Sequence, residues 1–327
     1  MSSDMVLLLS EETVRAQLRL PALVDVVGDA LAKQAAGAVE RPDRPHFPVG
    51  TGLDGDEPTG TAIAMPAYIH GEAQYATKLV GVHEGNADRG RPTVNAQIAL
   101  TDARTGRPEA YMAGTTITNA RTGCLGALAV RELAPETATL GVIGAGAQAR
   151  WQTRAIATVA GLDDVRIYSP SHSRVACADD LTADGVPARA VDTPRAAVAG
   201  ADAVVTATTA TAPVFPADAL APGALVVAVG AFTAEMQELE PTVLDGAAAA
   251  FADVPEEAAE TGDLLASDRG VDDLVPFGDV VAGRCSPPGP SETTVVVSVG
   301  SATLDAAAGA AVYRRAVEAG DGTVVSL

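Results

Sequence analysis

Residues 139–149 decide the fold, and they read TLGVIGAGAQA. Residues 140–143 have the apolar composition of a buried strand, and residues 147–160 are predicted to form a helix that ends at Gly161. Between them, Gly144 permits a tight turn, Gly146 lets the backbone approach a pyrophosphate, and Ala149 lets the helix pack closely on the strand. Unpaired N–H groups at the start of such a helix attract phosphate. The stretch predicts a Rossmann-type dinucleotide-binding unit, although methyltransferases use a similar loop and the pattern by itself leaves the cofactor open.

Short apolar strands alternate with helical segments beyond this loop. Strands are predicted at residues 165–168, 188–191, 203–206, 225–229 and 294–299, and a final helix at residues 302–319. This order is typical of a parallel, doubly wound sheet.

The N-terminal third has a different pattern. Residues 10–37 are expected to be helical, and residues 41–60, rich in proline and glycine, to be loop or irregular edge strand. From residue 61 to residue 113 apolar and polar side chains alternate, most clearly over residues 94–101, and turn-forming residues follow at Asp102–Gly106. We therefore expect an α+β region with an antiparallel sheet.

The charge balance is strongly acidic. The chain of 327 residues, long enough for two domains, carries 42 acidic and 22 basic residues, for a net charge of -20. Such a surface repels nucleic acid and anionic membranes. The composition resembles that of haloarchaeal proteins, so we expect a halophilic, cytoplasmic protein that binds neither nucleic acid nor membrane. An acidic enzyme from a mesophile is the alternative.

Cysteine usage and hydropathy exclude other classes. Cys124, Cys177 and Cys285 lie far apart without C-x-x-C spacing, which argues against a disulfide framework or a zinc site. The apolar run at residues 5–9 is too short for a signal peptide, and no run approaches the roughly 18 apolar residues of a membrane span. We expect no bound metal.

The end of the second predicted strand bears on the cofactor. Residues 168–174 read YSPSHSR, without the acidic residue that binds the ribose of NAD. The hydroxyl of Ser169 and the guanidinium of Arg174 suit a 2′-phosphate better, which favours NADP(H) over NAD(H). The alternative is a solvated loop with Arg174 on a helix surface.

Several motifs occur in register along the chain. They are MPAY at residues 65–68, YATKLV at 75–80, TNARTG at 118–123, VIGAGAQA at 142–149 and SVG at 298–300. Together they resemble the ornithine cyclodeaminase/mu-crystallin family, which includes archaeal alanine dehydrogenases and ketimine reductases. The resemblance covers nearly the full chain.

The resemblance implies an α/β protein and a homodimer. A Rossmann-type doubly wound parallel sheet, residues 119–302, would form the NAD(P)-binding domain. It would be inserted in a smaller α+β substrate-binding and dimerisation domain, residues 1–118 plus 303–327.

The resemblance also implies site residues. Arg44, Lys78 and Arg121 fall where the family binds the substrate carboxylate, and Thr122 with the glycine loop falls where it holds the cofactor phosphates. The full set of expected cofactor contacts is Thr122, Gly144, Gly146, Ala147, Gln148, Ser169, Arg174, Thr206 and Ser298.

The sequence around Lys78 gives this prediction partial support. Lys78 shares strand parity with Ala76 and Val80, so its ammonium projects from an apolar face, where it needs a partner or a solvated cleft. The alternative is a lysine that extends from an edge strand to solvent.

One position departs from the cyclodeaminase pattern. Two residues beyond Gly230, where cyclodeaminases carry an aspartate, this chain has Phe232, which cannot act as a general base. We therefore predict an NAD(P)(H)-dependent oxidoreductase acting on the C–N bond of a small 2-amino or 2-imino acid, either an imine reductase or an amino-acid dehydrogenase. The alternatives are an NAD-dependent ornithine cyclodeaminase, giving proline and ammonia, and a non-catalytic NADPH-binding protein of crystallin type.

Overall fold

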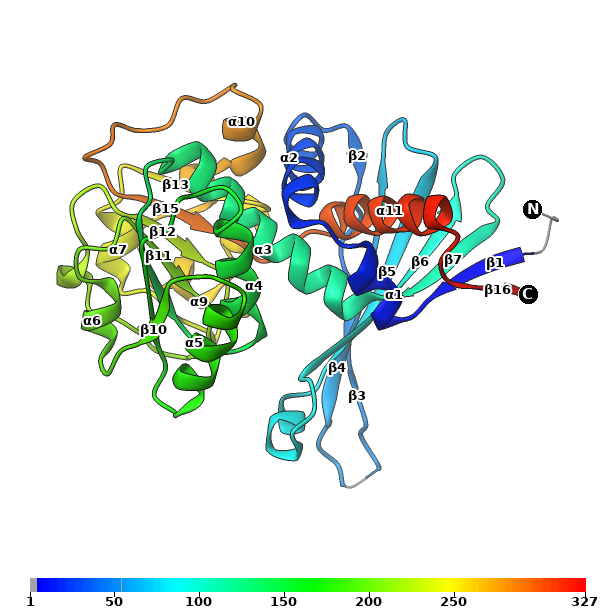
Figure 1. Cartoon of the computed structure of the whole chain (residues 1–327), viewed down its shortest axis with the longest axis horizontal. Helices are drawn as coiled ribbons and strands as arrows, with labels where there is room; N and C mark the ends of the chain where they lie inside the picture. Colours follow the sequence, from blue (N-terminus) through cyan, green and yellow to red (C-terminus); the bar gives the residue numbers. More distant parts are fainter. Residues whose placement is uncertain (1–4, 54) are drawn as a thin grey trace. The chain divides into compact units, whose positions relative to one another are not determined.

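The computed structural model describes residues 5–53 and 55–327. These residues form two compact units (Figure 1). Within the described residues, unit 1 comprises the chain up to Arg19, Gly37–Arg121 and Ser301–Leu327, and unit 2 comprises Leu20–Ala36 and Thr122–Gly300.

Unit 2 is built on a parallel sheet. Its strands are β8 (Thr139–Ile143), β9 (Asp164–Tyr168), β10 (Ala188–Ala190), β11 (Ala203–Thr206), β12 (Leu225–Ala228), β13 (Ala249–Ala252), β14 (Leu274–Pro276) and β15 (Thr294–Val297). They lie in the order β10-β9-β8-β11-β12-β15-β13-β14, and neighbouring strands are parallel. Strands β8, β9 and β10 are added toward one edge of the sheet, and β11 and the strands after it are added toward the other. The switch point therefore lies between β8 and β11, and doubly wound sheets bind their ligands at such a point. The predicted α/β fold is confirmed, and β13 and β14 are strands that the sequence analysis did not identify.

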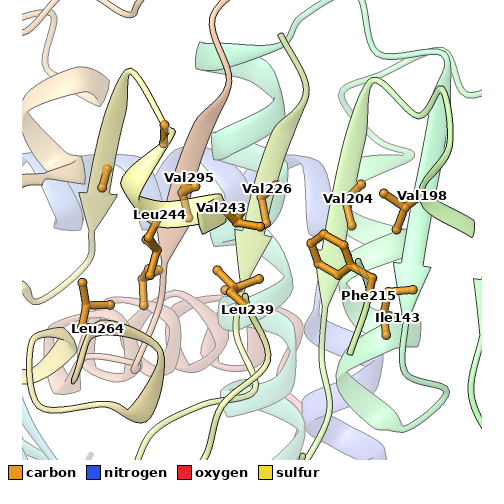
Figure 2. Close-up of a cluster of buried hydrophobic side chains, with 14 of the residues drawn as sticks. Ile143, Val198, Val204, Phe215, Val226, Leu239, Val243, Leu244, Leu264 and Val295 are labelled. Carbon is orange, nitrogen blue, oxygen red and sulfur yellow. The ribbon is translucent and has the colours of Figure 1, made fainter. Parts of the chain in front are cut away.

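Helices connect these strands and complete the core. They are α2 (Leu20–Ala35), α4 (Ala147–Ile156), α5 (Ser173–Ala183), α6 (Pro194–Val198), α7 (Pro241–Asp245), α8 (Pro255–Ala258), α9 (Gly262–Leu265) and α10 (Phe277–Val281), with short 3-10 turns η2 (Ala217–Ala219) and η3 (Val271–Asp273). Figure 2 shows Val204, Val226 and Val295 of neighbouring strands gathered with Phe215 and Leu239 in one buried cluster. Branched apolar residues suit strands that are covered on both faces.

Helix α2 groups with unit 2, whereas the sequence analysis placed residues 1–118 together in the substrate domain. A glycine at Gly278 lets α10 approach the carbonyl oxygen of Leu31 in α2, because a Cβ atom there would collide with it. Gln34 of α2 also donates a hydrogen bond of 2.6 Å from Nε2 to the carbonyl oxygen of Asp253. These tertiary contacts are invisible in the local sequence pattern.

Unit 1 is a largely antiparallel sheet with one long helix against it. Its elements are β1 (Met5–Leu9), α1 (Glu11–Gln17), β2 (Val39–Glu40), β3 (His46–Val49), β4 (Gly60–Ile69), β5 (Gln74–Val82), the 3-10 turn η1 (Glu84–Arg89), β6 (Val94–Asp102), β7 (Pro108–Ala113), α11 (Ala302–Ala319) and β16 (Thr323–Ser326). Helix α3 (Gly114–Leu133) begins in unit 1 and continues into unit 2. The sheet order is β16-β1-β7-β6-β5-β4-β2, with β3 paired to β4. The expected antiparallel strands β4 to β7 are confirmed, and the parallel pair β1–β7 was not expected.

Helix α11 lies across one face of this sheet (Figure 1). It begins where the side chain of Ser301 accepts a hydrogen bond from the backbone N–H of Thr303, and it ends at Gly320, whose φ of 70° is left-handed. Small residues dominate the helix, so its backbone lies close to the strands. Among the described residues, no helix combines the length and apolar character needed to cross a membrane.

Candidate active site

Three charged side chains meet in the interior of unit 1. Lys78 of β5 lies 2.6 Å from Asp305 of α11, measured from Nζ to Oδ2. Arg121 of α3 donates from Nε to the other carboxylate oxygen of Asp305, Oδ1, at 2.9 Å. The three side chains are 3%, 1% and 4% exposed for Lys78, Asp305 and Arg121 respectively. Strand β5 and helix α3 thus each bring one cation to the buried carboxylate of α11.

The sheet register explains why Lys78 points inward. Lys78 is directly opposite Met65 on β4 and Ile98 on β6, and both of these neighbours are buried. Directly opposite residues in an antiparallel pair project from the same face. The inward position predicted from strand parity is therefore confirmed, and the alternative of a lysine extending to solvent is wrong.

The electrostatics of this cluster favour an anionic ligand. Burial, together with repulsion from Arg121 and Arg44, lowers the pKa of Lys78 to about 8 against the attraction of Asp305. Burial alone would raise the pKa of Asp305, but the positive charges of Arg121 and Lys78 hold that pKa below its usual value. We call Lys78, Arg121, Arg44 and Asp305 the cationic cluster, because two buried cations share the Asp305 carboxylate and the charge of Arg44 also acts on Lys78.

Asp305 was not identified from the sequence. Its signal was faint: it is an acid within a helix whose neighbours are small and apolar, and it is 1% exposed. A buried carboxylate requires a cationic or N–H partner. The partners lie far away in the sequence, Arg121 being 184 positions from Asp305, so no local pattern connects them.

The glycine loop of unit 2 has the geometry that a phosphate-binding turn requires. Gly144 adopts φ +116°, and a Cβ atom there would collide with the carbonyl oxygen of Ala207. Gly146 is the N-cap of α4 and is exposed, and a Cβ atom there would contact nothing within 4 Å. Ala147 and Gln148 form the first turn of α4. The loop therefore presents an open helix N-terminus that fits a dinucleotide pyrophosphate.

A hydroxyl cluster follows β9, where a ribose or a 2′-phosphate would be expected. Ser169 Oγ lies 3.0 Å from Ser173 Oγ, and Ser171 Oγ lies 2.6 Å from the same atom. Arg174 donates to the carbonyl oxygen of Ser171 at 3.0 Å and lies 3.2 Å from a carboxylate oxygen of Asp192. Asp192, which reaches this loop from beyond β10, was not among the residues predicted from the sequence.

Three further predicted cofactor residues are buried. The hydroxyl of Thr206 donates to Glu238, and that of Ser298 donates to Asp253 at 2.7 Å, so both hydroxyl hydrogens are used inside unit 2. Thr122 accepts a hydrogen bond at its carbonyl oxygen from Gln152 Nε2, at 2.8 Å. Cofactor contacts from Thr122, Thr206 and Ser298 stay predictions. Their existing hydrogen bonds limit which of their atoms could also contact a cofactor.

Phe232 lies just after β12, and its side chain is 42% exposed. An exposed aromatic ring thus follows the carboxyl end of β12, at the position where the resemblance to cyclodeaminases led us to expect an aspartate. Within the described residues, no group of three or more His, Cys, Asp or Glu side chains is arranged to hold a metal ion.

Comparison with known proteins identifies close relatives of this architecture. A model of the ornithine cyclodeaminase/mu-crystallin family matches residues 4–320. The chain is 32% identical over 303 residues to a Delta(1)-pyrroline-2-carboxylate reductase of Bacillus cereus, covering 90% of this chain and 92% of that protein.

Solved structures show the same likeness. The structure of Thermococcus litoralis Delta(1)-pyrroline-2-carboxylate reductase, in complex with NADH and L-proline, has a TM-score of 0.91 at 27% identity, covering 97% of this chain and 99% of that one. An archaeal alanine dehydrogenase dimer with bound NAD has a TM-score of 0.89 at 27% identity, covering 99% of each chain. The match of the family model over almost the whole sequence, with the motifs in register, shows that the chain belongs to the ornithine cyclodeaminase/mu-crystallin family.

Proposed function

We propose that this protein reduces a cyclic 2-imino acid of the Δ1-pyrroline-2-carboxylate type to the corresponding cyclic amino acid. In broader terms it is an NAD(P)(H)-dependent oxidoreductase acting on the C–N bond of small 2-amino or 2-imino acids. The observation that carries the proposal is the cationic cluster, in which the buried ion pairs of Lys78 and Arg121 with Asp305 leave an excess of positive charge. The relatives named above act on substrates of this class.

Each residue of the cationic cluster has a separate role in this reaction. The guanidinium groups of Arg121 and Arg44 bind the substrate carboxylate and fix the ring. Lys78, whose pKa is lowered to about 8, is acidic enough to give a proton to the imine nitrogen near neutral pH. Asp305 holds the Lys78 ammonium in place during this transfer. The C=N double bond becomes a C–N single bond as one N–H bond and one C–H bond form.

The cofactor supplies the hydride that forms the C–H bond. Gly144, Gly146 and the first turn of α4 would hold its pyrophosphate. We propose NADP(H) rather than NAD(H), supported by the hydroxyl of Ser169 and the guanidinium of Arg174 beyond β9. Asp192 opposes this preference, since its carboxylate already pairs with Arg174 and would repel a phosphate.

Phe232 supports a preformed imine as substrate, rather than a 2-oxo acid plus ammonia or an amine that loses ammonia. Activation of ammonia, or loss of ammonia from ornithine, requires a base near the reacting nitrogen. An exposed phenyl ring cannot supply one, whereas it can pack against an apolar ring. A preformed cyclic imine needs only a hydride and a proton.

The test is a spectrophotometric assay of purified protein in molar potassium chloride. We expect NADPH oxidation with Δ1-pyrroline-2-carboxylate and formation of one proline per NADPH. Lys78→Met removes the ammonium while keeping much of the side-chain volume, and it should lower kcat by about a hundredfold. Its dissociation constant for NADPH should stay within about twofold. Proline formed from ornithine without net cofactor oxidation would instead identify a cyclodeaminase, and NADPH binding without turnover would identify a binding protein.

We also propose a homodimer that associates through the sheet of unit 1. Leu8, Tyr75, Leu79 and Tyr111 are partly exposed, and they project from the face opposite Lys78. A cluster of apolar side chains on one sheet face is typical of a subunit interface. Light scattering should give twice the chain mass of 32.9 kDa, and Leu79→Asp should shift the protein to monomer.

The net charge of -20 supports a further proposal, that the protein is halophilic and cytoplasmic. Ions at molar concentration screen the mutual repulsion of surface carboxylates.

A further inference from the structure

A buried carboxylate of unit 2 takes no part in the chemistry described above. Glu238 lies between β12 and α7 and is fully buried. Its Oε2 accepts a hydrogen bond from the hydroxyl of Thr206 at 2.8 Å and another from the backbone N–H of Gly230 at 2.8 Å. Its Oε1 accepts from the backbone N–H of Thr208 at 2.7 Å. One side chain therefore binds the segments that leave the carboxyl ends of two neighbouring strands, β11 and β12.

These segments lie directly against the glycine loop. A Cβ atom on Gly144 would collide with the carbonyl oxygen of Ala207 and approach Thr208 Cγ2. A Cβ atom on Gly230 would collide with the carbonyl oxygen of Thr208 and with the Glu238 carboxylate. The carboxylate, the two strand-end segments and the glycine loop are thus in continuous close contact, and a displacement of Thr208 would reach Gly144.

The position of Glu238 is itself held from behind. Asp263 of α9 accepts hydrogen bonds at Oδ1 from the backbone N–H groups of Glu238 and Leu239, at 2.7 and 2.8 Å. Burial raises the pKa of Glu238 to about 7, and the hydrogen bonds from Thr208, Thr206 and Gly230 limit that rise. Above pH 8 the group is mostly ionised and can accept from all three donors.

Burying a carboxylate costs free energy. Both oxygens of Glu238 accept hydrogen bonds, so an apolar side chain of the same shape would leave the buried donors of both strand ends without an acceptor. We propose that Glu238 is a positioning residue of the cofactor site, whose carboxylate fixes the ends of β11 and β12 against the glycine loop so that the loop keeps the shape that binds a nicotinamide dinucleotide. This inference rests on the proposed function, because it assumes that the loop binds such a cofactor.

The experiment compares Glu238→Gln with Asp263→Asn, an equal acid-to-amide change in the same buried network. A glutamine keeps one acceptor oxygen and turns its amide N–H₂ toward a donor, so one strand end loses its bond. An asparagine at position 263 keeps Oδ1 for both backbone donors and leaves the strand ends untouched. Dissociation constants of NADPH and NADH are measured by fluorescence titration at pH 8.5, together with kcat, the KM of each substrate and the melting temperature.

For Glu238→Gln we expect the dissociation constant and the KM of the cofactor to rise by at least about tenfold. A change of this size corresponds to the loss of one charge-assisted hydrogen bond. The KM of the imine should stay within about twofold, and Asp263→Asn should leave cofactor binding within about twofold. Should Glu238→Gln fail to fold, Gly230→Ala serves instead, because its Cβ displaces the same carboxylate and Thr208.

The outcomes separate this inference from the proposed function. Cofactor affinity that stays unchanged in a Glu238→Gln protein of lowered melting temperature would overturn the inference and leave the proposed function standing. Equal losses in Glu238→Gln and Asp263→Asn would also overturn it, since they would indicate a general loosening of unit 2. A wild-type protein that binds neither NADPH nor NADH would overturn both.

Discussion

Replacing Asp305 with asparagine removes the negative charge of the cationic cluster and keeps the size of the side chain. In the wild-type protein the carboxylate lies 2.6 Å from Lys78 and 2.9 Å from Arg121, and all three groups are almost fully buried. The substitution leaves two buried cations facing each other without an anion between them. Of these two cations, Lys78 can become neutral, because an ammonium can lose its proton whereas a guanidinium cannot.

We expect the pKa of Lys78 to fall below about 8 in Asp305→Asn, because the attraction that opposes burial has been removed. Lys78 acts in its protonated form, so activity is present below its pKa and is lost as the pH rises through it. The alkaline limb of kcat/KM for imine reduction should therefore move to lower pH. Loss of one charge-assisted contact, about 1.5–3 kcal/mol, corresponds to a tenfold to hundredfold fall in kcat/KM at pH 8.

The assay is NADPH oxidation with Δ1-pyrroline-2-carboxylate from pH 6 to pH 10, in wild type and variant. NADPH affinity is the control, and it should be unchanged because Asp305 belongs to unit 1 and the glycine loop to unit 2. A variant whose alkaline limb stays in place, with kcat/KM within about twofold of wild type, would refute the role assigned to Asp305.

Three further substitutions or conditions test other parts of the account. Arg174→Ala should weaken NADPH binding about tenfold and leave NADH binding unchanged, because the guanidinium is assigned to the 2′-phosphate. Fluorescence titration of both cofactors measures these affinities, and equal losses of affinity for the two would contradict the assignment. Gly144→Ala should lower the melting temperature and abolish cofactor binding, since its Cβ would collide with the carbonyl oxygen of Ala207 at a left-handed φ of +116°; full binding by a folded variant would count against the loop. Potassium chloride should raise the melting temperature steeply up to about 1 M, where the Debye length falls to about 3 Å. A flat response would contradict salt adaptation.

The sequence predicted those features that depend on local pattern. Alternation over residues 94–101 gave β6, and the spacing of Gly144 and Gly146 gave the turn between β8 and α4. These elements are specified within about ten residues. Strand parity also placed Lys78 on the inner face, although its assignment to a substrate site came from the family resemblance.

The sequence could not predict features that depend on partners distant along the chain. Asp305 is recognisable as a site residue only once α11 lies over β5, and Glu238 only once β11 and β12 end beside it. The same holds for β1, whose five residues pair with β7 and with β16 near the other end of the chain. The residues next to a short apolar run, or next to one acid among 42, do not reveal which distant segment or side chain it will contact.

The central claim is that the cationic cluster binds the carboxylate of a cyclic imine. It is tested most directly by the ratio of kcat/KM values for Δ1-pyrroline-2-carboxylate and for Δ1-pyrroline, the same ring without the carboxylate, with NADPH in molar potassium chloride. We expect a ratio of at least about a hundredfold, because the analogue lacks the carboxylate that would bind the arginines of the cluster and balance its excess positive charge. Equal kcat/KM values for the two imines would contradict it.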